Sequence, residues 1–86
     1  NKIKYFHSVA RKIYVYGTLE NMPIYCYEKM DELYEILSDK DKSFERISKS
    51  CIVNTNYVTA KGRKQVWIDD KVLSVTAKYR KELWFL

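Results

Sequence analysis

The chain has 86 residues, which suits one small domain that buries about 60 to 65 % of the surface of its unfolded chain. Sixteen Lys and Arg residues against 11 Asp and Glu give a formal net charge of +5, which favours a polyanionic partner over an acidic substrate. No apolar run approaches the length of about 18 residues needed to cross a bilayer, and no signal peptide is recognisable, so we expect a cytoplasmic protein.

The first part of the chain predicts three strands in a meander. Ile3–Ser8 and Ile13–Tyr16 are rich in β-branched and aromatic residues, and the basic pair Arg11-Lys12 lies at the junction between them. The turn-rich segment Gly17–Pro23 follows. A third strand is expected over Ile24–Tyr27, because proline is tolerated just before it or on a sheet edge.

The next segment predicts one full helix. Its apolar side chains follow the i, i+3, i+4, i+7 spacing of a helix face, at Met30, Leu33, Tyr34 and Leu37. The other face carries Asp31, Glu32, Glu35 and Ser38. We expect the apolar face to pack against a sheet and the acidic face to keep this helix away from a polyanion. Residues 39–42, Asp-Lys-Asp-Lys, predict a solvated loop.

The second half predicts five further strands separated by polar turns. These strands are Phe44–Ile47, Cys51–Val53, Tyr57–Ala60, Gln65–Ile68 and Val72–Val75. Thr76 is suited to cap a short basic helical segment that places Tyr79 and Leu83 on one face. The expected fold class is mainly β, with elongated antiparallel β sheets, one packing α-helix and a short C-terminal helical segment.

The residues that usually carry chemistry are sparse. Cys26 and Cys51 lie in apolar segments without CxxC spacing, which disfavours a zinc site and favours buried free thiols over a disulfide. His7 is the only histidine, and it is more typical of a surface or half-buried structural residue than of a catalytic one. With no glycine-rich phosphate loop or carboxylate pair at a strand end, we expect neither an enzyme nor a cofactor.

Two segments together resemble a known family. Residues 44–54, FERISKSCIVN, combine an aromatic residue, an arginine, a polar basic turn, a serine and an apolar run that ends in Val-Asn. Residues 76–83, TAKYRKEL, form a basic segment that begins with Thr and contains Tyr. In this order they resemble the LytTR-type DNA-binding domain of bacterial response regulators, over about Ile3 to Leu83. The resemblance leads us to expect a single LytTR-like domain over residues 1–86, excised from a longer regulator.

The resemblance implies sequence-specific binding of double-stranded DNA, as the output domain of a transcriptional regulator in a two-component system. In that family, loops of stacked antiparallel sheets enter successive major grooves. The matching positions that we expect to contact bases are Arg11, Lys49 and Lys78. Arg grips guanine O6 and N7 with two hydrogen bonds, whereas Lys reaches the same acceptors as a point charge. The contacts to phosphates are assigned to Lys12, Ser50 and Lys81.

Lys12 is an alternative to Arg11 as the base reader, because the sequence fixes the register of that loop only to within one residue. Arg46 is expected to support the motif turn, and Asn54 to bond backbone groups near Asn56. The resemblance also implies that two protomers bind paired direct repeats of DNA and that a receiver domain lies upstream of this domain. The alternative function is that of a non-catalytic protein-interaction or RNA-binding β module.

Overall fold

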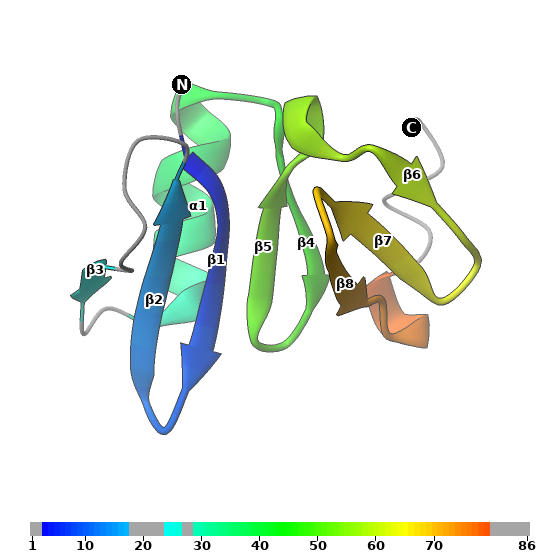
Figure 1. The fold of residues 1–86 in the computed structure, drawn as a ribbon. Coiled ribbons are helices and arrows are strands. Elements are labelled where there is room, and N and C mark those ends of the chain that lie inside the picture. The colour runs from blue at the N-terminus through cyan, green and yellow to red at the C-terminus, as the bar shows by residue number, and fades with distance from the viewer. Residues whose placement is uncertain (1–2, 18–23, 27–28, 80–86) are drawn as a thin grey trace.

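The computed structural model describes residues 3–17, 24–26 and 29–79 (Figure 1). The elements of the first half are β1 (Ile3–Val9), β2 (Lys12–Gly17), β3 (Ile24–Cys26) and α1 (Met30–Lys40). Those of the second half are β4 (Phe44–Ser48), β5 (Cys51–Asn54), the 3₁₀ turn η1 (Thr55–Tyr57), β6 (Ala60–Lys61), β7 (Gln65–Ile68) and β8 (Lys71–Ser74). A further 3₁₀ turn follows over residues 77–79.

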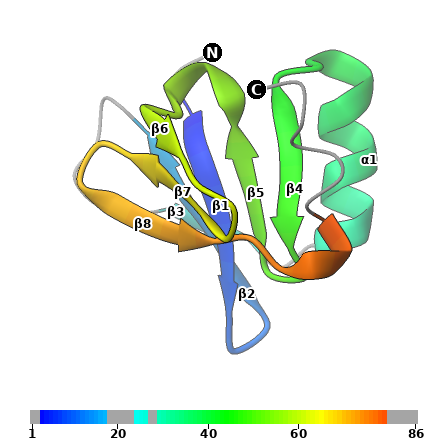
Figure 2. The ribbon, with the colours of Figure 1, turned by 90° about the vertical axis from the view of Figure 1, so that its right-hand side faces the viewer.

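The strands form two antiparallel sheets, which confirms the predicted fold class. Five strands are ordered β3-β2-β1-β5-β4, and three are ordered β6-β7-β8. Figure 2 shows α1 on one side of the larger sheet and the smaller sheet on its other side. The fold has principal extents of 29 × 26 × 25 Å, so its elongation is slight.

Strand β5 lies at the centre of this arrangement and is buried on both faces. Ile52 points into a cluster with residues of α1, including Leu33, whereas Cys51 and Val53 join a cluster with residues of the smaller sheet, including Val66. Successive side chains of a strand alternate between its faces, so one strand contributes to two cores. Full burial of each aliphatic side chain contributes about 1.5 to 3 kcal/mol. The apolar side chains on both sides of the turn at Lys49 and Ser50, called the motif turn below, are all buried: Phe44, Ile47, Ile52 and Val53.

The predicted structural role of Asn54 is confirmed. Its side-chain amide Nδ2 donates to the carbonyl of Ile3 at 2.9 Å, and its Oδ1 accepts from the backbone N–H of Asn56 at 3.0 Å. The second contact starts the 3₁₀ turn η1, because a side-chain acceptor satisfies a backbone donor at that turn. This turn explains why the predicted strand over Tyr57–Ala60 is wrong: only its last residue lies in a strand, β6.

The structure corrects the predicted end of the helix and confirms a buried thiol. The helix continues to Lys40, so the solvated loop predicted from residue 39 begins later. The Cys51 thiol is free and buried, as predicted, while the side chain of Cys26 lies outside the described residues. His7 is half-buried on β1, opposite Tyr14 of β2. Among the described residues, no helix has the length and apolar character that a bilayer crossing requires.

Candidate nucleic-acid interface

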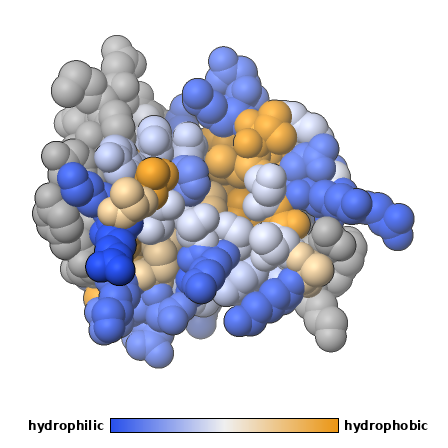
Figure 3. Space-filling model, turned by 90° about the horizontal axis from the view of Figure 1, so that it is seen from below, coloured by the Kyte–Doolittle hydropathy of each residue, from blue (hydrophilic) through white to orange (hydrophobic). Residues whose placement is uncertain are grey.

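Three turns that are distant in the sequence meet at one end of the fold. Strand β1 pairs antiparallel with β5, with His7 opposite Cys51, so the end of β1 lies beside the beginning of β5. The β1–β2 turn and the β4–β5 turn therefore lie at the same end, and Figures 1 and 2 show both at the bottom of the view. Figure 3 shows this end from below, where hydrophilic side chains gather over much of the surface.

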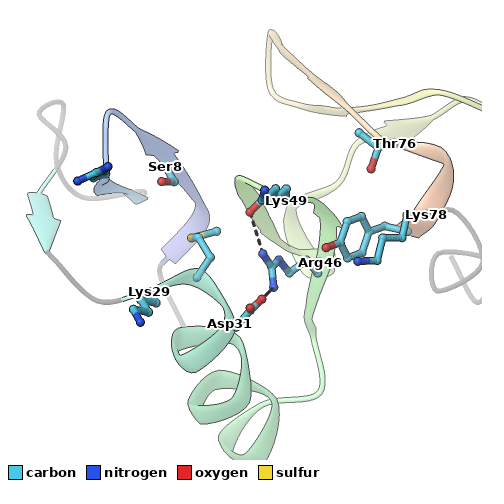
Figure 4. A pocket seen from close by; sticks show the side chains of 10 residues that line it. Ser8, Lys29, Asp31, Arg46, Lys49, Thr76 and Lys78 are labelled. Carbon is cyan, nitrogen blue, oxygen red and sulfur yellow. Dashed lines mark hydrogen bonds and ion pairs between the residues drawn. The ribbon is translucent and has the colours of Figure 1, made fainter.

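A pocket of about 780 Å³ opens among these turns. It is lined by Ser8, Arg11, Lys29, Met30, Asp31, Arg46, Lys49, Thr76, Lys78 and Tyr79 (Figure 4). All three residues predicted to contact bases belong to this set, and they come from three different turns. The sequence placed them on separate loops, and the fold brings them to one surface.

The β1–β2 turn presents Arg11 at its tip. Val9 pairs with Lys12, so Ala10 and Arg11 form a two-residue loop, with φ angles of 52° and 67°. Positive φ at both positions is typical of a type I′ turn, whose twist matches that of the hairpin. Left-handed backbone is unfavourable for residues with a Cβ, so this tip stores strain. Arg11 is exposed, whereas Lys12 is the first residue of β2 and half-buried.

The β4–β5 turn presents Lys49. Ser48 pairs with Cys51 after a shift in the strand register, which leaves Lys49 and Ser50 as the turn between them. Lys49 is exposed. The carbonyl of Ser50 accepts from the backbone N–H of Ser8 at 2.7 Å, so this turn is tied to β1 beside the first hairpin.

Arg46 holds the motif turn from beneath. Only 6 % of this residue is exposed. Its Nε donates to the carbonyl of Ser48 at 3.2 Å and its Nη2 to the carbonyl of Lys49 at 2.8 Å. Its Nη1 donates to the Oδ1 of Asp31, which is also its ion-pair partner (Figure 4). The guanidinium thus fixes the backbone that carries Lys49, in agreement with the supporting role predicted for Arg46.

The third turn is joined to the same arginine. Thr76 donates its backbone N–H to the carbonyl of Ile47 at 3.0 Å, which attaches the segment after β8 to β4. The ring of Tyr79 has the guanidinium carbon of Arg46 and the ammonium of Lys78 each 5.5 Å from its centroid. Such cation–π contacts orient charged groups over an aromatic face. Lys78 is exposed and lies at the edge of the pocket (Figure 4).

The first turn of α1 also belongs to this surface, although none of its residues was expected to contact DNA. It contributes Asp31 to the pocket, and Lys29 precedes it. The hydrogen bond from Arg46 and its charge, followed by the charges of Lys78 and Lys49, hold the pKa of the Asp31 carboxyl below its ordinary value. The acidic face of α1 was expected to keep the helix away from a polyanion, yet one of its carboxylates lies among the cations. No pattern in the sequence near Asp31 predicts its contact with Arg46.

Two of the residues assigned to phosphate contacts, Lys12 and Ser50, are described by the structure, and neither lines the pocket. Lys12 and Ser50 are half-buried next to Arg11 and Lys49, whereas Lys81 lies outside the described residues. In the described ranges, no three His, Cys, Asp or Glu side chains come together as a metal site requires. The surface is therefore a cationic hollow on a rigid β framework, with one acidic side chain in it.

The family model of the LytTr DNA-binding domain matches residues 1–84. The chain belongs to this LytTR family. A solved structure of similar fold is the LytTr DNA-binding domain of a Bacillus cereus protein that is described as a methyl-accepting/DNA response regulator. The two share 23 % sequence identity with a TM-score of 0.78, over 94 % of this chain and 76 % of the other. Among curated proteins, none matches this chain. The LytTR fold is thus that of a DNA-binding module.

Proposed function

We propose that this LytTR domain recognises a specific double-stranded DNA sequence through Arg11, Lys49 and Lys78, on basic loops that enter the major groove. One observation carries the proposal: these three cations, from three turns far apart in the sequence, line one open pocket. The major groove offers the O6 and N7 acceptors of guanine, which match guanidinium and ammonium donors. The turns that bear the cations are fixed by hydrogen bonds to buried strands, and such support is what base readout requires.

The flanking residues fit a second role in the same contact. Lys12, Ser50 and Lys81 are proposed to contact phosphates, which set the register of the protein on DNA without reading its sequence. Lys12 and Ser50 adjoin the proposed base readers Arg11 and Lys49 in the chain, which supports this second role. The formal charge of +5 supports the attraction to the backbone.

The domain is proposed to be the non-catalytic output domain of a bacterial transcriptional regulator that acts in the cytoplasm within a two-component system. A receiver domain upstream of residues 1–86 and binding of two protomers to paired direct repeats belong to the same proposal. A small domain with three reading side chains binds one site weakly, so tight binding is expected to need adjacent copies on one duplex.

The test begins with selection of bound duplexes from a random-sequence pool, followed by affinity measurements on the enriched duplex and on a random one. If about four to six phosphates are neutralised, log K falls with log salt at a slope of about −4 to −5. A flat salt response rules out the phosphate contacts. Equal affinity for the two duplexes rules out sequence recognition and favours a general interaction module.

Variants then separate the two roles. Arg11→Ala and Lys78→Ala are each expected to cost about 1 to 3 kcal/mol on the selected duplex and little on the random one, whereas Lys81→Ala weakens both alike. Lys42→Ala is the matched control, because Lys42 is an exposed lysine in the loop between α1 and β4, at the far end of the fold (Figure 1). If the base-reader variants lose the same factor on both duplexes, with folding intact, their assignment to bases is wrong.

A further inference from the structure

Asp31 is an acidic side chain in the middle of a surface that we assign to a polyanion. The carboxylate lines the same pocket as Lys49 and Lys78, and 87 % of its side chain is exposed. A negative charge at such a place opposes the approach of phosphates, so it lowers affinity for DNA in general. Pairing with Arg46 does not require this exposure, and the position of the carboxylate therefore suggests a role toward the ligand.

The geometry leaves one carboxylate oxygen available to a ligand. Oδ1 of Asp31 accepts from Nη1 of Arg46, and that guanidinium is itself fixed by two turn carbonyls. Within the part of the chain that the structure describes, Oδ2 makes no hydrogen bond. The carboxylate is thus held in one orientation with a free acceptor at the pocket (Figure 4). The lowered pKa of Asp31 keeps it ionised at neutral pH, so it accepts and does not donate.

Donors and an acceptor side by side match one kind of base pair. In the major groove a G·C pair presents the N7 and O6 acceptors of guanine and then the N4 amino donor of cytosine, whereas an A·T pair has its donor between two acceptors. The ammonium groups of Lys49 and Lys78 and the carboxylate of Asp31, which line one pocket, supply two donors and an acceptor that complement the first pattern. A carboxylate that accepts from cytosine N4 is also a recognised mode of base readout.

We propose that Asp31 is a specificity-determining residue, which accepts a hydrogen bond from the N4 amino group of a cytosine whose paired guanine is contacted by Lys49 or Lys78. The inference rests on the proposed function. The same carboxylate repels phosphates that occupy the pocket in other registers. Asp31 therefore increases discrimination in two ways, by a bond to the correct base and by a penalty on incorrect alignments.

The test compares Asp31→Asn with Glu32→Gln in selections from the random duplex pool. Asn at position 31 removes the charge but keeps an oxygen that accepts from Arg46. Glu32 is exposed on the same helical turn and lies outside the pocket lining, so its variant makes the same change in net charge elsewhere. The wild type is expected to enrich a cytosine at one position. The Asp31 variant loses that preference and keeps the others, and the Glu32 variant keeps them all.

Affinity for random duplexes adds a second measurement. Asp31→Asn is expected to bind them about three- to tenfold more tightly, which corresponds to removal of one repulsive charge near the surface. Glu32→Gln is expected to change this affinity by less than about twofold. If Asp31→Asn keeps the base preference of the wild type, the inference about Asp31 is wrong, while the proposed function is unaffected. A wild-type selection that enriches no sequence overturns the proposed function, and this inference with it.

Discussion

Replacement of Arg46 by lysine tests whether the motif turn must be held in place for DNA recognition. Lysine keeps the positive charge, but a single ammonium does not reproduce the planar fork of donors that reaches Ser48, Lys49 and Asp31 at once. We therefore expect Arg46→Lys to behave as a loss of position with no loss of charge. Specific binding falls, while the general attraction to DNA is kept.

The magnitude follows from the contacts. Hydrogen bonds that involve a charged group contribute about 1.5 to 3 kcal/mol each, but the turn carbonyls released by Arg46→Lys lie near solvent and take up water. The lysine ammonium keeps Asp31 as an opposite charge beside it, so the change does not leave a buried charge without a partner, which would cost about 3 to 5 kcal/mol. The expected decrease in the free energy of unfolding is about 2 to 3 kcal/mol. That loss lowers Tm by about 10 to 20 °C in a domain of this size.

Urea denaturation and duplex binding below the new transition provide the measurement. Affinity for the selected duplex is expected to fall about tenfold, less than the full effect of removing a base reader, and affinity for a random duplex to stay within about twofold. Arg63→Lys is the control, because Arg63 is exposed and outside the pocket. An Arg46→Lys protein that binds the selected duplex like the wild type refutes the idea that this arginine positions the turn.

Three further outcomes are expected. Lys49→Ala leaves the melting curve unchanged and removes about 1 to 3 kcal/mol of specific binding, whereas Ile52→Ala, at a fully buried position, loses about 2 to 5 kcal/mol of stability. Normal binding of the selected duplex by Lys49→Ala contradicts entry of this turn into the groove. Ala10→Gly raises the free energy of unfolding by about 0.5 kcal/mol, because relief of left-handed strain exceeds the added freedom of the unfolded chain, and a decrease in urea denaturation argues against the strain. Burial raises the pKa of the Tyr5 hydroxyl and of the Cys51 thiol to about 12, so the unfolded chain releases these protons at lower pH than the folded one. The stability that they contribute is complete below pH 9 and declines as pH rises toward 12. Denaturation midpoints that stay constant over this range contradict the expectation.

Local pattern alone determined much of this domain. The continuous apolar run of β5, which is buried on both faces, and the helical spacing from Met30 to Leu37 indicate which side chains are buried, because each backbone conformation repeats its side-chain direction at a fixed interval. The exposed cations of the turns were predictable for the same reason, since polar residues between short strands stay in solvent. The motif in residues 44–54 then indicated the family.

Tertiary structure decided what those cations form together. Pairing of β1 with β5 joins segments more than 40 residues apart and places two turns at one end, and no local propensity encodes that partner. The Asp31–Arg46 pair joins a helix to a strand through the packing of α1 on the sheet, so a face that reads as merely solvated contributes to the pocket. Likewise, the side chain of Asn54 imposes a 3₁₀ turn where the residues themselves favour a strand. Contacts between distant residues decided the first two of these features, because strand pairing and helix packing join residues that local propensity does not relate. At the 3₁₀ turn, a side-chain hydrogen bond only two residues along the chain outweighed the small differences in intrinsic propensity.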